Sequence, residues 1–138
     1  MRHDVAPPGY SALHVVRPTG PALPSRGGGL ATVFRHCVPV RVHPLADNYL
    51  PSTFELQLLR VDAASSSVTV LNLYRPQWMS TPSTFSDELA EIIASLTSEC
   101  ADDIVVCGDV NCPEPDDSSV ASELFECLDS VAVTLLVT

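Results

Sequence analysis

The sequence predicts a single α/β domain, and three observations support this class. The 138 residues are enough for one domain with a core and too few for two, and an apolar share of 46% fits a globular protein. Short β-branched runs bounded by turn residues are typical of strands. Two segments with apolar residues at helical spacing, 82–96 and 118–128, are typical of helices.

The first part of the chain is predicted to form strands joined by turns. Strands are expected at 12–17 and 30–35, and residues 38–42 continue the second one past a bend at Pro39. Arg26-Gly27-Gly28-Gly29 precedes the second strand and is predicted to be a flexible turn. Neither a P-loop nor a dinucleotide-binding fingerprint accompanies these glycines, so they do not indicate a phosphate-binding loop.

A hairpin is predicted for residues 54–58 and 68–74. The first strand alternates apolar and polar residues as a half-buried strand does, which places Glu55 on a solvent face. In the second strand, alternation places Asn72 and Tyr74 on the same face, at the point where the strand ends. This polar pair could belong to a site. The alternative is a tyrosine packed at a sheet edge with its hydroxyl in water.

The helix that begins at Pro82 is predicted to bury a stripe of large apolar residues: Phe85, Leu89, Ile92, Ile93 and Leu96. Its acidic residues are expected to form a solvated face near the positive end of the helix dipole: Asp87, Glu88 and Glu91. A second helix is predicted after a cap at Ser118 or Ser119, followed by a strand-like run at 131–137.

The segment 103–111 carries the strongest functional signal. Its apolar run 104–107 is too short for a helix and predicts a strand buried on both faces, ended by Gly108. Asp109 and Asn111 follow at i and i+2, so their side chains project to the same side if the chain stays extended. A carboxylate and an amide presented together can orient and deprotonate a water. The alternative is an Asp/Asn turn that closes a strand.

The charge is unevenly distributed along the chain. Residues 1–60 hold six Arg against three acidic residues, residues 61–138 hold one Arg against fourteen, and Lys is absent. Because phosphate contacts supply most of the affinity for nucleic acid, only weak DNA binding is expected, through Arg17, Arg26, Arg35 and Arg41.

The cysteines and the N-terminus indicate the compartment. The five cysteines are an odd number without a Cys-x-x-Cys spacing, which predicts free thiols rather than a zinc site or a disulfide framework. The N-terminus lacks the apolar run of a signal peptide, and no apolar stretch is as long as a membrane span. An intracellular location without a membrane partner is therefore expected.

Three blocks, 27–35, 71–76 and 105–111, carry a resemblance to a known family. In order and spacing they resemble the endonuclease/exonuclease/phosphatase family, specifically the apurinic-endonuclease-like domain of LINE-type non-LTR retrotransposons. The similarity covers about residues 9–130 and corresponds to the middle of the family domain. It implies that residues 1–138 form a single partial domain, a two-sheet β-sandwich flanked by helices.

The same resemblance implies Mg²⁺-dependent hydrolysis of phosphodiester bonds in DNA. Asp109 would activate the attacking water, Asn111 would position it, and Tyr74 would donate its hydroxyl to a phosphate oxygen. Asn72 and Arg75 would contact the substrate.

Two further blocks of the family are not found in this sequence. The metal-binding Glu of a Glu-Thr-Trp type block and the Ser-Asp-His block are both absent, so the main Mg²⁺ ligand is expected to be missing. The expectation is thus a nuclease fragment that is inactive as this chain and prone to self-association. The alternative is a non-catalytic remnant with only weak nucleic-acid or protein binding. A calcineurin-type phosphoesterase built on Gly108 and Asp109 fits less well, because no His follows His43.

Overall fold

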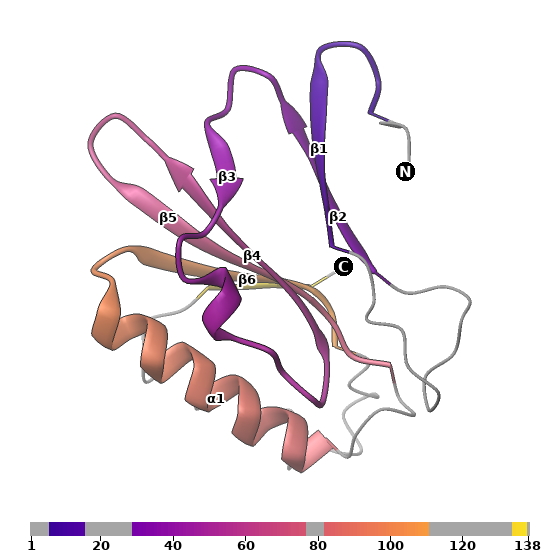
Figure 1. Cartoon of the computed structure of the whole chain (residues 1–138), viewed down its shortest axis with the longest axis vertical. Helices are drawn as coiled ribbons and strands as arrows, with labels where there is room; N and C mark the ends of the chain where they lie inside the picture. The colour runs from indigo at the N-terminus through magenta and orange to yellow at the C-terminus, as the bar shows by residue number, and fades with distance from the viewer. Residues whose placement is uncertain (1–5, 16–28, 77–81, 111–133, 138) are drawn as a thin grey trace.

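The computed structural model describes residues 6–15, 29–76, 82–110 and 134–137. Within these ranges the chain is a mixed α/β structure, mostly strands, with two sheets and one α-helix (Figure 1). The predicted α/β class is therefore confirmed at this level. In the same ranges, no helix combines the length and the apolar character needed to cross a membrane.

The larger sheet has five strands in the order β3-β4-β5-β6-β7. They are β3 (Val40–Val42), β4 (Glu55–Asp62), β5 (Ser67–Tyr74), β6 (Asp103–Asp109) and β7 (Thr134–Val137). β4 runs antiparallel to β3 and β5, whereas β6 runs parallel to β5 and β7. Parallel neighbours require a crossover connection, and α1 (Pro82–Glu99) lies within the one between β5 and β6.

The core forms where α1 packs on one face of this sheet, here called the helix face. The apolar stripe predicted for the helix is buried as expected, and Phe85, Ile93 and Leu96 are fully buried. From the sheet, the buried residues that pack with it are Leu58, Leu71, Leu73, Ile104 and Val106. The alternation predicted for residues 68–74 is confirmed, because Leu71 and Leu73 are buried while Asn72 and Tyr74 are partly exposed.

The opposite face of the five-stranded sheet is here called the inner face. By alternation and register it carries the side chains of Glu55, Gln57, Leu59, Asn72, Tyr74, Cys107 and Asp109. The second sheet, made of β1 (Tyr10–Val15) and β2 (Leu30–Arg35) in antiparallel pairing, lies against it on the side away from α1 (Figure 1).

Several sequence-based predictions differ from the structure in physically instructive ways. Glu55 was expected on a solvent face but is only 8% exposed, because the β1–β2 sheet covers that face. Tyr74 does not lie at a sheet edge, since β5 is the middle strand of five. The strand at 103–108 does not end at Gly108 but continues to Asp109. The second predicted helix, 118–128, lies outside the described residues.

Strand boundaries elsewhere shift by a few residues. The prediction at 30–35 matches β2, and the first strand lies at 10–15 within the described part. Residues 38–42 do not continue β2, because a turn at His36 and Cys37 redirects the chain into the separate strand β3. β3 then joins the other sheet, pairing with β4.

Glu88 ties α1 to the loop that precedes β4. Its carboxylate accepts the backbone N–H groups of Ser52 and Thr53 at 3.0 and 2.9 Å, and also both hydroxyls. Partial burial acts to raise the pKa of Glu88, but these hydrogen bonds outweigh it and hold the pKa below its ordinary value. The prediction that Glu88 belongs to a solvated face is therefore wrong, and the first turn of α1 contains no acidic residue.

Glu88→Gln is expected to lower the free energy of unfolding by about 1–2 kcal/mol at neutral pH, because a neutral acceptor replaces a charged one. A carboxylate with a lowered folded pKa stabilises the fold above its ordinary value of 4.5 and loses this contribution as the pH falls through the folded pKa. In urea unfolding, the difference in the free energy of unfolding between wild type and variant should therefore shrink as the pH is lowered. Glu91→Gln, an exposed position on the same helix, is the matched control. Equal losses for the two variants would contradict this role.

Candidate functional site

Three polar residues from neighbouring strands form one row on the inner face, here called the strand-end row. The register pairs Glu55 of β4 with Tyr74 of β5, and Tyr74 with Asp109 of β6. Paired residues of adjacent strands project to the same face, and the strands lie about 4.8 Å apart. Tyr74 therefore stands between two carboxylate residues, of which Glu55 is buried and Asp109 is exposed.

Backbone contacts fix both ends of this row. Gly29, at the entry to β2, donates its N–H to the Glu55 carboxylate at 2.7 Å. At the other end, the N–H of Arg75 donates to the carbonyl of Asp109 at 2.9 Å. The row is thus held by the ends of β5 and β6 on one side and by the start of β2 on the other.

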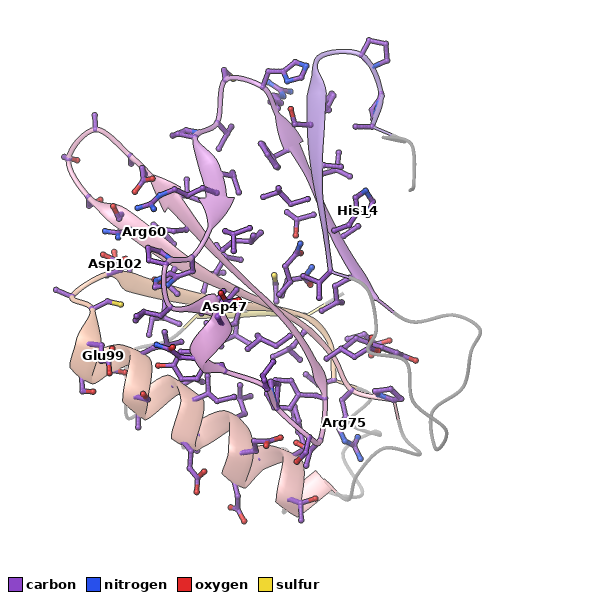
Figure 2. The ribbon with its side chains drawn as sticks, viewed as in Figure 1. His14, Asp47, Arg60, Arg75, Glu99 and Asp102 are labelled. Carbon is purple, nitrogen blue, oxygen red and sulfur yellow. The ribbon has the colours of Figure 1, made fainter. Side chains whose placement is uncertain are left out.

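Arg75 follows Tyr74 and projects to the opposite face. Its side chain is buried, its guanidinium donates to the carbonyl of Val110 at 3.1 Å, and it lies 5.7 Å from the centre of the Phe85 ring. Figure 2 shows Arg75 beside the N-terminal end of α1. These contacts support the backbone just after Asp109, and the proposed substrate contact of Arg75 stays a prediction.

An amide network forms the next row of the inner face. Gln57 accepts the Thr32 hydroxyl at 2.6 Å and the Asn72 side-chain N–H at 3.2 Å, and it donates to the Leu13 carbonyl at 2.9 Å. The Asn72 amide also donates to the Thr32 hydroxyl at 3.2 Å and to the Ala31 carbonyl at 3.4 Å. In this structure the amide N–H groups of Asn72 therefore bind the second sheet.

The structure brings some of the predicted site residues together. Tyr74 and Asp109 are neighbours in one row, and Asn72 lies on the same face one step along β5. Arg75 projects away from them, and Asn111 lies outside the described residues. Sequence reasoning placed Glu55 on a solvent face and therefore left it out of the site. Its place opposite the last residue of β5 depends on the hairpin register, which the turn between β4 and β5 sets.

A second cluster lies near the C-terminal end of α1. Ligand-type atoms of His43, Cys100 and Asp102 all lie within 4.8 Å of one another, and Asp102 also accepts from Thr69 and pairs with Arg60 at 3.3 Å. Figure 2 shows Arg60 and Asp102 close together there. Nitrogen, sulfur and carboxylate donors together are the set that Zn²⁺ prefers.

Hydrogen bonding at His43 opposes metal binding by this cluster. Nδ1 of His43 accepts the N–H of Leu45 at 3.0 Å, and Nε2 faces the Cys100 sulfur at 3.8 Å. A neutral imidazole has one nitrogen lone pair, so Nε2 carries the hydrogen and cannot also bind a metal. Burial and the nearby Arg60 lower the pKa of His43, and burial raises the pKa of the Cys100 thiol. The pair is therefore neutral and hydrogen-bonded.

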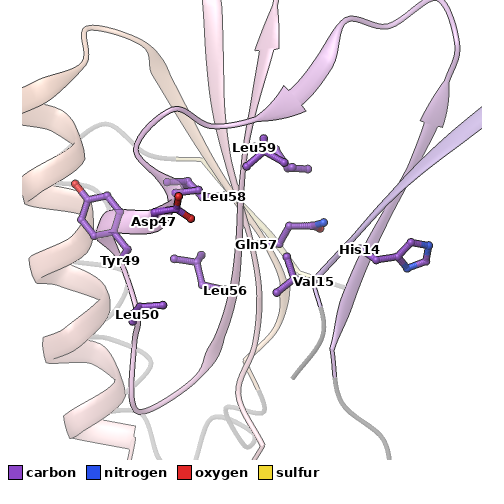
Figure 3. A pocket seen from close by; sticks show the side chains of 11 residues that line it. His14, Val15, Asp47, Tyr49, Leu50, Leu56, Gln57, Leu58 and Leu59 are labelled. Carbon is purple, nitrogen blue, oxygen red and sulfur yellow. The ribbon is translucent and has the colours of Figure 1, made fainter. Parts of the chain in front are cut away.

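A mostly apolar cleft of about 220 Å³ opens between β1, the short 3₁₀ helix η1 (Ala46–Asn48) and β4 (Figure 3). Val15 lines one side, Tyr49 and Leu50 line the other, and Gln57 is among the residues at its base. Neither Tyr74 nor Asp109 lines it, so the cleft is separate from the strand-end row.

Comparisons with models of protein families, with curated proteins and with solved structures find no match. The fold and the site define the chain as a mixed α/β protein with a polar row at the end of its larger sheet. The resemblance to a nuclease family depends on the three sequence blocks alone.

Proposed function

We propose that this chain is part of a Mg²⁺-dependent DNA endonuclease of the endonuclease/exonuclease/phosphatase type, from a LINE-type retrotransposon, and that it is inactive as this chain. The observation that carries the proposal is the register that aligns Tyr74 with Asp109 on one face. These two residues come from separate sequence blocks, and the resemblance gives both a catalytic role. Their alignment is what a shared site would require.

The donors of the strand-end row fit a magnesium ion. Mg²⁺ prefers oxygen ligands, usually one or two carboxylates together with substrate phosphates. Glu55 is the carboxylate of this row that would hold the ion, since Asp109 is assigned to the water. When bound, the ion would stabilise the negative charge that develops on the phosphate and the leaving group.

Each residue of the row has a separate role in the proposed chemistry. Asp109 is exposed, so its carboxylate can reach a solvent molecule and accept the proton of the attacking water. Tyr74 would donate its hydroxyl to a nonbridging phosphate oxygen and so stabilise charge there. Arg75 would act through the backbone, because it holds the carbonyl of Val110 next to Asp109.

Metal binding by the row gives the direct test. Mn²⁺ can replace Mg²⁺ and is followed by its electron paramagnetic resonance signal. We expect weak Mn²⁺ binding by the purified chain that is lost in Glu55→Gln, a variant that keeps an acceptor for Gly29, and retained in the control Glu91→Gln. Binding that is unchanged in Glu55→Gln would refute the assignment of this row.

Nicking of supercoiled plasmid separates the fragment from a complete enzyme. Because two catalytic blocks of the family are not found in this sequence, and such residues act as a unit, we expect no nicking with Mg²⁺ above a blank. Nicking that disappears in Asp109→Ala and persists in Asp87→Ala would instead make this chain a working nuclease.

The alternative function is a remnant that binds nucleic acid or protein weakly. The charge supports weak DNA binding, since the net value is −10 and Arg41, one of the cations expected to contact phosphate, is paired with Asp62 at 2.6 Å. A remnant would not bind Mn²⁺ at the row, so the Mn²⁺ titration distinguishes the two functions. Weak duplex binding is expected of both, and an electrophoretic shift at physiological salt and submicromolar protein would contradict that expectation.

A further inference from the structure

The contact between the two sheets includes a network of polar groups. Gln57 is only 2% exposed and bonds to three partners, two of which belong to β1 and β2. Asn72 and Glu55 add bonds to Thr32, Ala31 and Gly29. Each of these groups can exchange its partner for water, so separating the sheets costs only the net value of each hydrogen bond.

The β1–β2 sheet contributes little apolar burial to the fold. Every residue of β1 and β2 remains partly or largely exposed, and the buried apolar cluster under α1 comes from the segments between Phe54 and Val110. On the inner face, Leu59 is the one buried apolar residue among those that the structure describes, at 1% exposed. Val15 and Val33 are 38% and 50% exposed. Because hydrophobic stabilisation scales with the apolar area removed from water, detaching this sheet removes a small share of it.

The junction between the sheets is also incompletely filled. The cleft in Figure 3 lies between Val15 of β1 and Leu50 of the loop after η1, with Gln57 at its base. Leu50 is 89% exposed, so it does not cover the cleft. Water can therefore enter the cleft next to the polar network, although Gln57 itself is almost completely shielded while the sheets are in contact.

We propose that the β1–β2 sheet is a cover that opens as a unit from the inner face, with the Gln57 amide as its latch. Opening breaks the bonds to Thr32 and Leu13, releases the Asn72 amide, and frees the Glu55 carboxylate from Gly29. The inner face is then exposed to water without loss of the core under α1. This proposal depends on the contacts between the sheets and does not rest on the proposed nuclease function.

Native-state hydrogen exchange of the full chain tests the cover. An isolated two-stranded hairpin is at best marginally stable in water, so the amides of β1 and β2 should exchange once the cover detaches. We expect them to exchange at least about tenfold faster than amides of the core strands, such as Leu71 and Val106, since local opening costs less than global unfolding.

Thr32→Val removes the hydroxyl that bonds to Gln57 and receives the Asn72 amide, with almost no change in shape. It is expected to accelerate exchange in β1 and β2 by a further factor of about ten, while β5 and β6 stay unchanged. Thr69→Val is the matched control, because Thr69 is buried on the helix face and bonds to Asp102. Equal protection of both sheets in the wild type, or a uniform acceleration in Thr32→Val, would overturn the proposal. The wild-type comparison decides the matter even if the variant does not fold.

Discussion

Gly108→Ala is expected to destabilise the chain by at least about 3 kcal/mol, or to prevent folding, because backbone strain and a steric clash add together. Gly108 has a φ of 124°, which side chains rarely adopt. A Cβ at this position would lie 1.9 Å from the carbonyl oxygen of Leu73 on β5. Relieving the clash requires β5 and β6 to separate beside Asp109, in the middle of the sheet.

Gly9→Ala separates the effect of backbone strain from that of the steric clash. Gly9 has a φ of 85°, but a Cβ there would meet nothing within 4 Å. This variant should therefore cost only the strain of the left-handed region, about 1–2 kcal/mol. Both variants can be compared by urea unfolding followed by circular dichroism. Similar losses for the two would show that the close approach of Gly108 to Leu73 has no energetic weight.

The elements that depend on local pattern were predictable from the sequence. The helix of α1 and the strands β2, β5 and β6 follow from apolar periodicity, which the chain displays within each segment. The place of Gly108 was not predictable in the same way. Glycine commonly ends a strand, but Gly108 lies within β6. It is glycine there because the backbone of β5 passes too close for any side chain.

The environment of a polar face was the main feature that sequence could not supply. Alternation correctly separates Glu55 and Gln57 from their apolar neighbours, yet it cannot show whether water or protein covers them. The cover comes from residues more than twenty positions away, through bonds to Gly29 and Thr32. Glu88 illustrates the same limit, since its partners Ser52 and Thr53 lie in a distant loop.

The candidate site also combines residues that the sequence predicts with one that only the structure reveals. Tyr74 and Asp109 were predicted from their blocks, and the register of β5 and β6 places them side by side. Glu55 entered the site only with the structure, because its alignment opposite Tyr74 requires the β4–β5 pairing. Asn111 remains a prediction outside the described residues. A strand-end site thus requires both the local motifs and the order of the strands.

Phe85→Ala is expected to lower the free energy of unfolding by about 3–5 kcal/mol, the range for a large aromatic removed from a packed core. Phe85 is completely buried, and its ring meets Phe54 edge to face with the centroids 5.3 Å apart. The Arg75 guanidinium lies over the same ring. Loss of the ring therefore leaves a cavity and removes a surface on which the Arg75 side chain packs.

Phe85→Leu and Val33→Ala are the comparison variants for the loss in the free energy of unfolding. Leucine keeps most of the apolar volume and should cost less than alanine, whereas Val33 is half exposed and its truncation should stay within about 0.5 kcal/mol. Urea unfolding of the three variants gives the order. If Phe85→Ala cost no more than Val33→Ala, the sheet would not depend on α1 for its core.

Because Arg75 joins Phe85 to the carbonyl of Val110, the alanine variant should also loosen the backbone next to Asp109. Faster exchange of the Arg75 amide, which bonds to the Asp109 carbonyl, would report that link between core and site.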